Sequence, residues 1–91
     1  LRSHTAVEAD VRSELLLLPE VTAVPRVQVF YLDGGLAVEA QCRMLEHLTV
    51  SELREVAKAG QASLKRGLPD SLVDVSIGLD LGSAYVETDA F

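Results

Sequence analysis

Residues 24–45 alternate between apolar and polar side chains on both sides of a short turn, Asp33-Gly34-Gly35. A period of two is typical of strands, and glycines accept the positive φ angles of a tight hairpin turn. The segment therefore predicts two antiparallel strands, at 24–32 and 36–45. One face of this hairpin is apolar and the other is largely polar, so the sheet should be covered on one face only. The apolar face comprises Val27, Val29, Tyr31, Val38, Ala40, Cys42 and Met44.

Two amphipathic helices are predicted on either side of this hairpin. Thr5 and Glu8 have the spacing of a capping box, and Pro19 should end the helix that they open. A second capping box, at Thr49 and Glu52, opens the other helix, and Gly67 is expected as its C′ residue. The apolar stripes that should face the sheet are Val7, Val11, Leu15 and Leu18 in the first helix, and Val50, Leu53, Val56, Ala57 and Leu64 in the second.

A third strand is predicted over 72–81, where the alternation returns with Val73, Val75, Ile77 and Leu79 on one face. The order helix-strand-strand-helix-strand predicts an α+β two-layer sandwich of the ferredoxin-like or metallochaperone-like kind. Its sheet should be three-stranded and mixed, with both helices on one face. We expect this domain to span residues 1–81 and to be followed by an extended or disordered tail over 82–91.

Composition excludes several classes of function. The 91 residues carry a net charge of −6, whereas a nucleic-acid partner requires clustered Lys and Arg, so none is expected. The longest aliphatic run, at 15–18, is far shorter than the roughly 20 residues of a membrane-spanning helix. The sequence has neither a Gly-rich phosphate loop nor a nucleophile elbow, so an enzyme is not expected.

The open sheet face predicts a partner. It is only half polar, and a chain of this length builds a thin core. A second copy of the chain is the simplest cover for such a face. Phe30 is large, apolar and on that face, which makes it the candidate contact. We therefore expect a homodimer formed through the open sheet face.

Acidic side chains on the same face predict a divalent-metal site. Glu39 belongs to the second strand, Asp74 and Asp80 belong to the third, and His47 lies in the loop before the second helix. Carboxylates with one imidazole suit Zn²⁺, Mn²⁺ or Fe²⁺, bound weakly. The alternative interpretation is an ordinary solvated face that binds no metal. Cys42 is expected in the core, because strand alternation directs it away from Glu39.

Five short motifs resemble the cytoplasmic C-terminal domain of cation diffusion facilitator metal-efflux transporters. They are LPEVTAV at 18–24, VQVF at 27–30, DGG at 33–35, LTVSEL at 48–53, and LP at 68–69 followed by VDVSI at 73–77. The resemblance implies a regulatory and dimerisation domain on the cytoplasmic face of a membrane, joined to a membrane-embedded transport domain. The chain starts without Met, so we expect it to be a piece of such a longer protein. In the family, metal binding is thought to tighten a V-shaped dimer.

The chain departs from the family at the positions where histidines are frequent. Those positions hold Pro25, Gln28, Gln41, Arg54 and Gly78, none of which is a usual zinc ligand. Arg54 is expected to pair with a carboxylate such as Glu39 and so to replace a metal ion. Two other functions stay open: a small-molecule-binding regulatory domain of the amino-acid-sensing type, and a purely structural dimerisation module.

Overall fold

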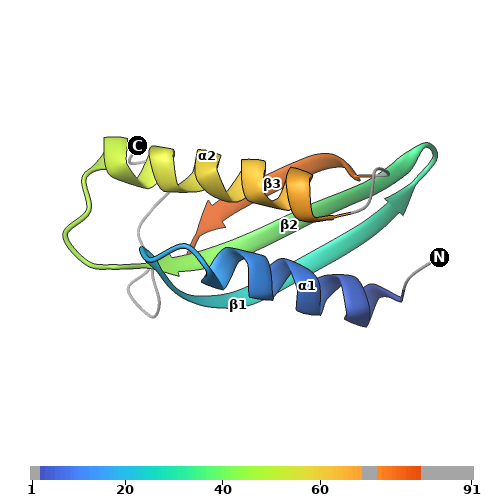
Figure 1. The fold of residues 1–91 in the computed structure, drawn as a ribbon, viewed down its shortest axis with the longest axis horizontal. Helices are drawn as coiled ribbons and strands as arrows, with labels where there is room; N and C mark the ends of the chain where they lie inside the picture. Colours follow the sequence, from blue (N-terminus) through green and yellow to red (C-terminus); the bar gives the residue numbers. More distant parts are fainter. Residues whose placement is uncertain (1–2, 69–71, 81–91) are drawn as a thin grey trace.

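The computed structural model describes residues 3–68 and 72–80, which form a three-stranded sheet with two helices. The elements follow the order α1 (His4–Leu16), β1 (Val21–Leu32), β2 (Gly35–Met44), α2 (Val50–Gly67) and β3 (Leu72–Leu79) (Figure 1). This order and the mixed sheet confirm the predicted fold class. The predicted tail, 82–91, lies outside the described residues, as does residue 81, the predicted last residue of the third strand.

β2 is the central strand of the sheet. It pairs antiparallel with β1 and parallel with β3, so the strand order is β1-β2-β3. The hairpin turns at Asp33 and Gly34, where Gly34 adopts a φ of 93°. β1 begins three residues earlier than predicted, because register irregularities between Val21 and Arg26 let the strand continue past Pro25. Pro25 is tolerated there because β1 is an edge strand.

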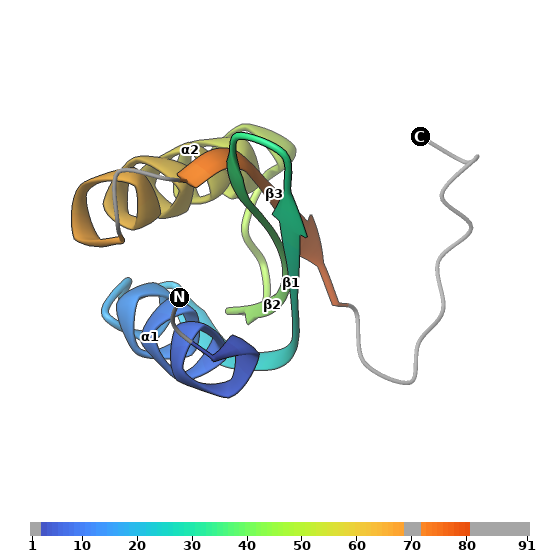
Figure 2. The same cartoon turned by 90° about the vertical axis from the view of Figure 1, so that its right-hand side faces the viewer.

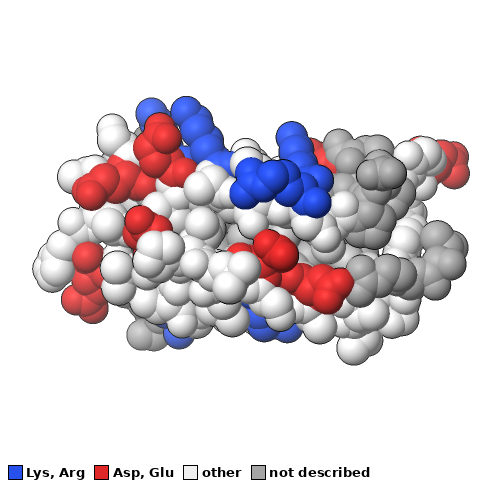
Figure 3. Space-filling model, viewed as in Figure 1, with Lys and Arg blue, Asp and Glu red and all other residues white. Residues whose placement is uncertain are grey.

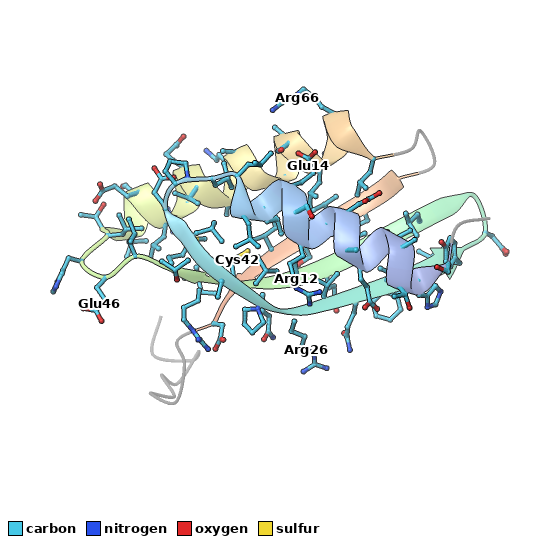
Figure 4. The ribbon with its side chains drawn as sticks, turned by 60° about the horizontal axis from the view of Figure 1, so that its bottom comes forward. Arg12, Glu14, Arg26, Cys42, Glu46 and Arg66 are labelled. Carbon is cyan, nitrogen blue, oxygen red and sulfur yellow. The ribbon has the colours of Figure 1, made fainter. Side chains whose placement is uncertain are left out.

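Both helices cover the same face of the sheet, as Figure 2 shows, and the other face carries no helix among the described residues. The core between the two layers is aliphatic. Val7, Val11 and Leu15 of α1 and Leu64 of α2 are at most 1% exposed. They pack against the apolar side of the sheet, which includes Val38 and Cys42 of β2. The sulfur of Cys42 lies under the helices in Figure 4. This confirms the apolar stripe of α1 and the apolar face of β2.

The start of α1 differs from the expected capping box. Ser3 is the N-cap: it has extended backbone angles, and its hydroxyl accepts a hydrogen bond from the Ala6 N–H at 3.2 Å. Thr5 already lies inside the helix, so it cannot cap it. The helix ends at Leu16, before Pro19. His4 stacks on Tyr31 of β1 with ring centroids 4.9 Å apart, which fastens this end of α1 to the hairpin.

α2 begins at the predicted capping box. Thr49 Oγ1 accepts from the Glu52 N–H at 3.1 Å, and Glu52 Oε1 accepts from the Thr49 N–H at 2.9 Å. Gly67 is the last helical residue rather than the C′ residue, because the chain stays helical up to Leu68, which is the C-cap. The predicted apolar stripe is partly wrong: Val56 and Leu64 are buried, Leu53 is half-buried, and Val50 is 60% exposed.

Polar contacts hold the helices in place. Arg12 Nε donates to the Val24 carbonyl of β1 at 2.9 Å, and Gln61 Nε2 donates to the Val75 carbonyl of β3 at 3.2 Å. Ser63 Oγ of α2 donates to Glu14 Oε2 of α1 at 2.9 Å. Each helix is thereby tied to one edge strand and to the other helix. Within the described residues, no helix is long and apolar enough to cross a membrane.

Candidate functional site

Three rows of neighbouring residues cross the open face of the sheet, and Arg43 with Asp80 adds a fourth at one end. Strand register places Gln28 of β1 beside Glu39 of β2, and Glu39 beside Ser76 of β3. A second row runs from Arg26 through Gln41 to Gly78, and a third from Phe30 through Ala37 to Asp74. Phe30 is 43% exposed on this face, whereas Ala37 opposite it is only 9% exposed. The face is therefore polar along its middle, and near the hairpin turn it combines apolar Phe30 and Ala37 with the exposed Asp74.

Glu39 interacts with β1. When the Gln28 amide is oriented to satisfy its neighbours, its nitrogen donates to Glu39 Oε2 at 3.2 Å and its oxygen accepts from Arg26 Nη2 at 2.8 Å. Figure 4 shows Arg26 projecting from β1 away from the helices. The expected pairing of Glu39 with Arg54 is wrong, because α2 carries Arg54 on the opposite side of the sheet.

Asp80 interacts with β2 at the end of the sheet. Arg43 Nη2 lies 2.8 Å from Asp80 Oδ2, which makes an ion pair as well as a hydrogen bond. The Asp80 N–H also donates to the Cys42 carbonyl at 2.9 Å, and this hydrogen bond fixes the backbone position from which the Asp80 side chain projects. The Asp80 side chain is 20% exposed and that of Arg43 is 49% exposed. This is the most enclosed charged pair on the open side of the sheet for which both partners are described.

His47 lies in the loop before α2, in the left-handed region with a φ of 69°. Its side chain is 93% exposed, and Nε2 lies 3.7 Å from Oε2 of the adjacent Glu46. His47 and Asp80 both line one pocket of about 510 Å³ at this end of the sheet. The pocket is lined by both apolar and polar residues: Thr22, Arg43, Met44, Leu45, Glu46, His47, Leu48, Leu53, Leu79 and Asp80.

The four predicted metal ligands are spread out in a single chain. Asp74 lies at the hairpin end of the face, Glu39 in the middle, and Asp80 with His47 at the other end. Within 3–68 and 72–80, no three His, Cys, Asp or Glu residues gather as a metal-binding group. The donor set of one chain therefore does not fit a divalent ion, which needs several donors at 2.0–2.6 Å. Their assignment as ligands stays a prediction, and it requires a second copy to supply donors.

Arg26 and Arg43 are the charged side chains of the open face to which the sequence assigned no partner. Strand alternation had placed both on the polar face, which was the available signal. Alternation does not give the register between strands, which brings Arg43 to Asp80 and leaves Arg26 in contact with the Gln28 amide.

Cys42 lies in the core, 1% exposed, and burial raises the pKa of its thiol. It therefore stays protonated at neutral pH and points away from Glu39, as predicted. The helix-covered side of the molecule presents charges of both signs (Figure 3). Lys58, Lys65 and Arg66 of α2 are exposed there, and mixed charge of this kind is typical of a solvated surface.

Comparison with solved structures shows that the chain has the fold of a transporter's C-terminal domain. The similar structures are C-terminal domains of MamM, a member of the cation diffusion facilitator family. A variant of this domain in a cadmium form has a TM-score of 0.80 at 16% identity, covering 89% of this chain and 100% of the other. A variant in a nickel form has a TM-score of 0.77 at 16% identity, covering 84% and 95%.

Sequence comparisons add nothing to this likeness. No protein-family model matches the chain, and no curated protein matches it in sequence.

A third MamM variant has a TM-score of 0.79 at 15% identity, covering 86% of this chain and 96% of the other. At such identities the likeness establishes the fold, and function must be argued from the surface of the domain.

Proposed function

We propose that this chain is a regulatory and dimerisation domain of a divalent-metal efflux transporter of the cation diffusion facilitator kind. It would lie on the cytoplasmic face of the membrane, attached to a membrane-embedded transport domain. The observation that carries the proposal is the fold match over most of both chains to MamM C-terminal domains, some of them in metal forms. The sequence motifs at 18–24 and 48–53 point to the same family independently.

The open sheet face is the proposed dimer surface. Within residues 3–68 and 72–80, both helices cover the other face, and we therefore assign the second copy to this side of the sheet. Phe30 presents exposed apolar surface there, and Leu32, beyond it at the end of β1, is 54% exposed. A two-fold arrangement would place the same patch on both sides of the contact, which is how symmetric homodimers form.

Metal binding in this proposal is weak. Glu39, His47, Asp74 and Asp80 are the candidate donors for Zn²⁺, Mn²⁺ or Fe²⁺. Because they are spread along one chain, an ion would have to be held between two copies. The role of such an ion would be to favour one arrangement of the two copies over another.

Sedimentation equilibrium at tens of micromolar tests the dimer. We expect a mass twice that of the 9.8 kDa chain for the wild type and a monomer for Phe30→Glu, which puts a charge into the proposed contact. Leu17→Glu is the matched control: Leu17 follows α1, away from the open face, and is 74% exposed, so its variant should still dimerise. A wild type that sediments only at 9.8 kDa would exclude a dimerisation domain.

A further inference from the structure

The carboxylates over the middle and far end of the open face are already matched by the chain's own polar and cationic groups. Arg43 from β2 makes the 2.8 Å ion pair with Asp80. Glu39 accepts from Gln28, whose oxygen is in turn held by Arg26 at 2.8 Å. Both arrangements join neighbouring strands: Arg43 lies directly beside Asp80, whereas Arg26 is linked to Glu39 through the Gln28 amide.

Spacing along the strands keeps the carboxylates from sharing an ion. Glu39 is level with Ser76, and Asp80 lies four residues further along β3, which corresponds to about 13 Å. Asp74 lies two residues from Ser76 in the other direction, or about 7 Å. A divalent ion bound at any one of them would find few further donors from the same chain. At Asp80 it would also approach the fixed positive charge of Arg43.

Guanidinium groups are permanent cations. Arginine does not lose its proton in proteins, and its planar donors suit a carboxylate. With Arg26 and Arg43 present, the described charges of Glu39, Asp74 and Asp80 leave one net negative charge on each open face. Without them, each face would carry three. Two copies could then approach only with counter-ions between them.

We propose that Arg43, supported by Arg26, occupies the place of a metal ion on this face, so that the assembly of two copies does not respond to divalent cations. This rests on the dimer proposed above but not on its weak metal site. The two proposals differ on whether a bound ion changes the arrangement of the copies, and the experiments below decide between them. The domain would act as a constitutive clamp between two copies, whose arrangement is independent of the metal concentration around it. Arg43 is the residue to test, because it pairs with Asp80 and both line the pocket that His47 also lines.

Calorimetric titration of the chain with ZnCl₂ and MnCl₂ tests the proposal, using Arg43→Gln as the main variant. Glutamine retains a hydrogen-bond donor for Asp80 and removes the charge. Metal affinity should rise by about tenfold or more in Arg43→Gln, because repulsion at the Asp80 carboxylate is removed. Arg54→Gln is the matched control: it removes an exposed arginine from α2, and it should bind metal as the wild type does.

Sedimentation of the wild type in EDTA and in 100 μM ZnCl₂ provides the second readout. The dimer dissociation constant should agree within about twofold between the two conditions. A wild type that binds metal with micromolar affinity, and loses it in Asp80→Asn, would overturn the proposal. So would an Arg43→Gln variant with unchanged affinity. A chain that is monomeric in every condition would refute the dimer instead, and calorimetry would still decide whether Arg43 excludes the metal.

Discussion

Gly60 of α2 packs so closely against Ile77 of β3 that a Cβ on the glycine would lie 2.7 Å from Ile77 Cδ1. The same Cβ would lie 3.0 Å from Cδ2 of Leu15 on α1, a residue that is fully buried. Gly60 therefore marks the point where the second helix approaches both the sheet and the first helix.

Gly60→Ala should lower the free energy of unfolding by about 1 kcal/mol. Alanine favours the helix by about 1 kcal/mol, but overpacking a core contact costs about 1–3 kcal/mol. In an Ile77→Val background Cδ1 is gone but the 3.0 Å approach to Leu15 Cδ2 remains, so Gly60→Ala should cost less than it does in the wild type. Urea denaturation of the four proteins measures both effects. Ala62→Gly, at an exposed position of α2, measures the difference in helix propensity between alanine and glycine. If Gly60→Ala stabilised the otherwise wild-type protein by that full difference, the close packing at Gly60 would be contradicted.

Leu64→Ala should be far more damaging than Leu53→Ala, although both leucines were predicted on one apolar stripe. Leu64 is 0% exposed, so its truncation leaves a cavity and should cost about 2–5 kcal/mol. Leu53 is half-buried and lines the open pocket, where water can fill the space, so about 1 kcal/mol is expected. Val50→Ala serves as the exposed control. Equal denaturation midpoints for Leu64→Ala and Leu53→Ala would show that α2 is rotated from the orientation described.

The capping box should make the stability of α2 depend on acid pH. Hydrogen bonds with Thr49 lower the pKa of the Glu52 carboxyl below its ordinary value. The bond with the Thr49 backbone is the larger cause and the bond with its side chain is the smaller. The ionised carboxylate therefore stabilises the fold at neutral pH, and this contribution is lost as the pH falls through the lowered pKa. Thr49→Ala should cost about 1 kcal/mol at pH 7.

Thermal melts between pH 7 and pH 3 check the role of Glu52. Glu52→Gln keeps a side-chain acceptor for the Thr49 N–H, so it should remove this part of the acid dependence while the helix stays capped. Glu55→Gln, one turn into the same helix, is the control and should leave it in place. An acid dependence identical in Glu52→Gln and the wild type would mean that this carboxylate contributes nothing to it.

Cys42 should resist alkylation in the folded protein. Its thiol is 1% exposed, and burial raises its pKa, so the reactive thiolate is scarce at neutral pH. As the pH rises above the ordinary thiol pKa, the unfolded chain loses this proton before the folded one, and the stability due to the protonated thiol declines. Iodoacetamide labelling followed by mass spectrometry measures the rate. A Gln41→Cys, Cys42→Ala protein supplies an exposed thiol one position away, and equally fast labelling of the two proteins would place Cys42 outside the core.

Local patterns in the sequence were enough to predict the elements and most of their faces. The alternation on each side of Gly34 defines β1 and β2, and the pair Thr49 and Glu52 defines the start of α2. These signals succeed because a period of two, a capping box and a glycine turn act between residues a few positions apart. Where two nearby hydroxyls compete, as Ser3 and Thr5 do, local pattern alone selected the wrong one.

Tertiary structure decided what those faces contact. The sequence by itself placed Glu39, Asp74 and Asp80 on the open face and Val50 and Leu53 on an apolar stripe. Only the packing of α2 against the sheet exposes Val50 and leaves Leu53 half-buried. Only the register of three strands brings Arg43 to Asp80, 37 positions away in the chain. Contacts between residues so far apart in the chain depend on the register of neighbouring strands. The packing of side chains in the core between the sheet and the helices sets that register.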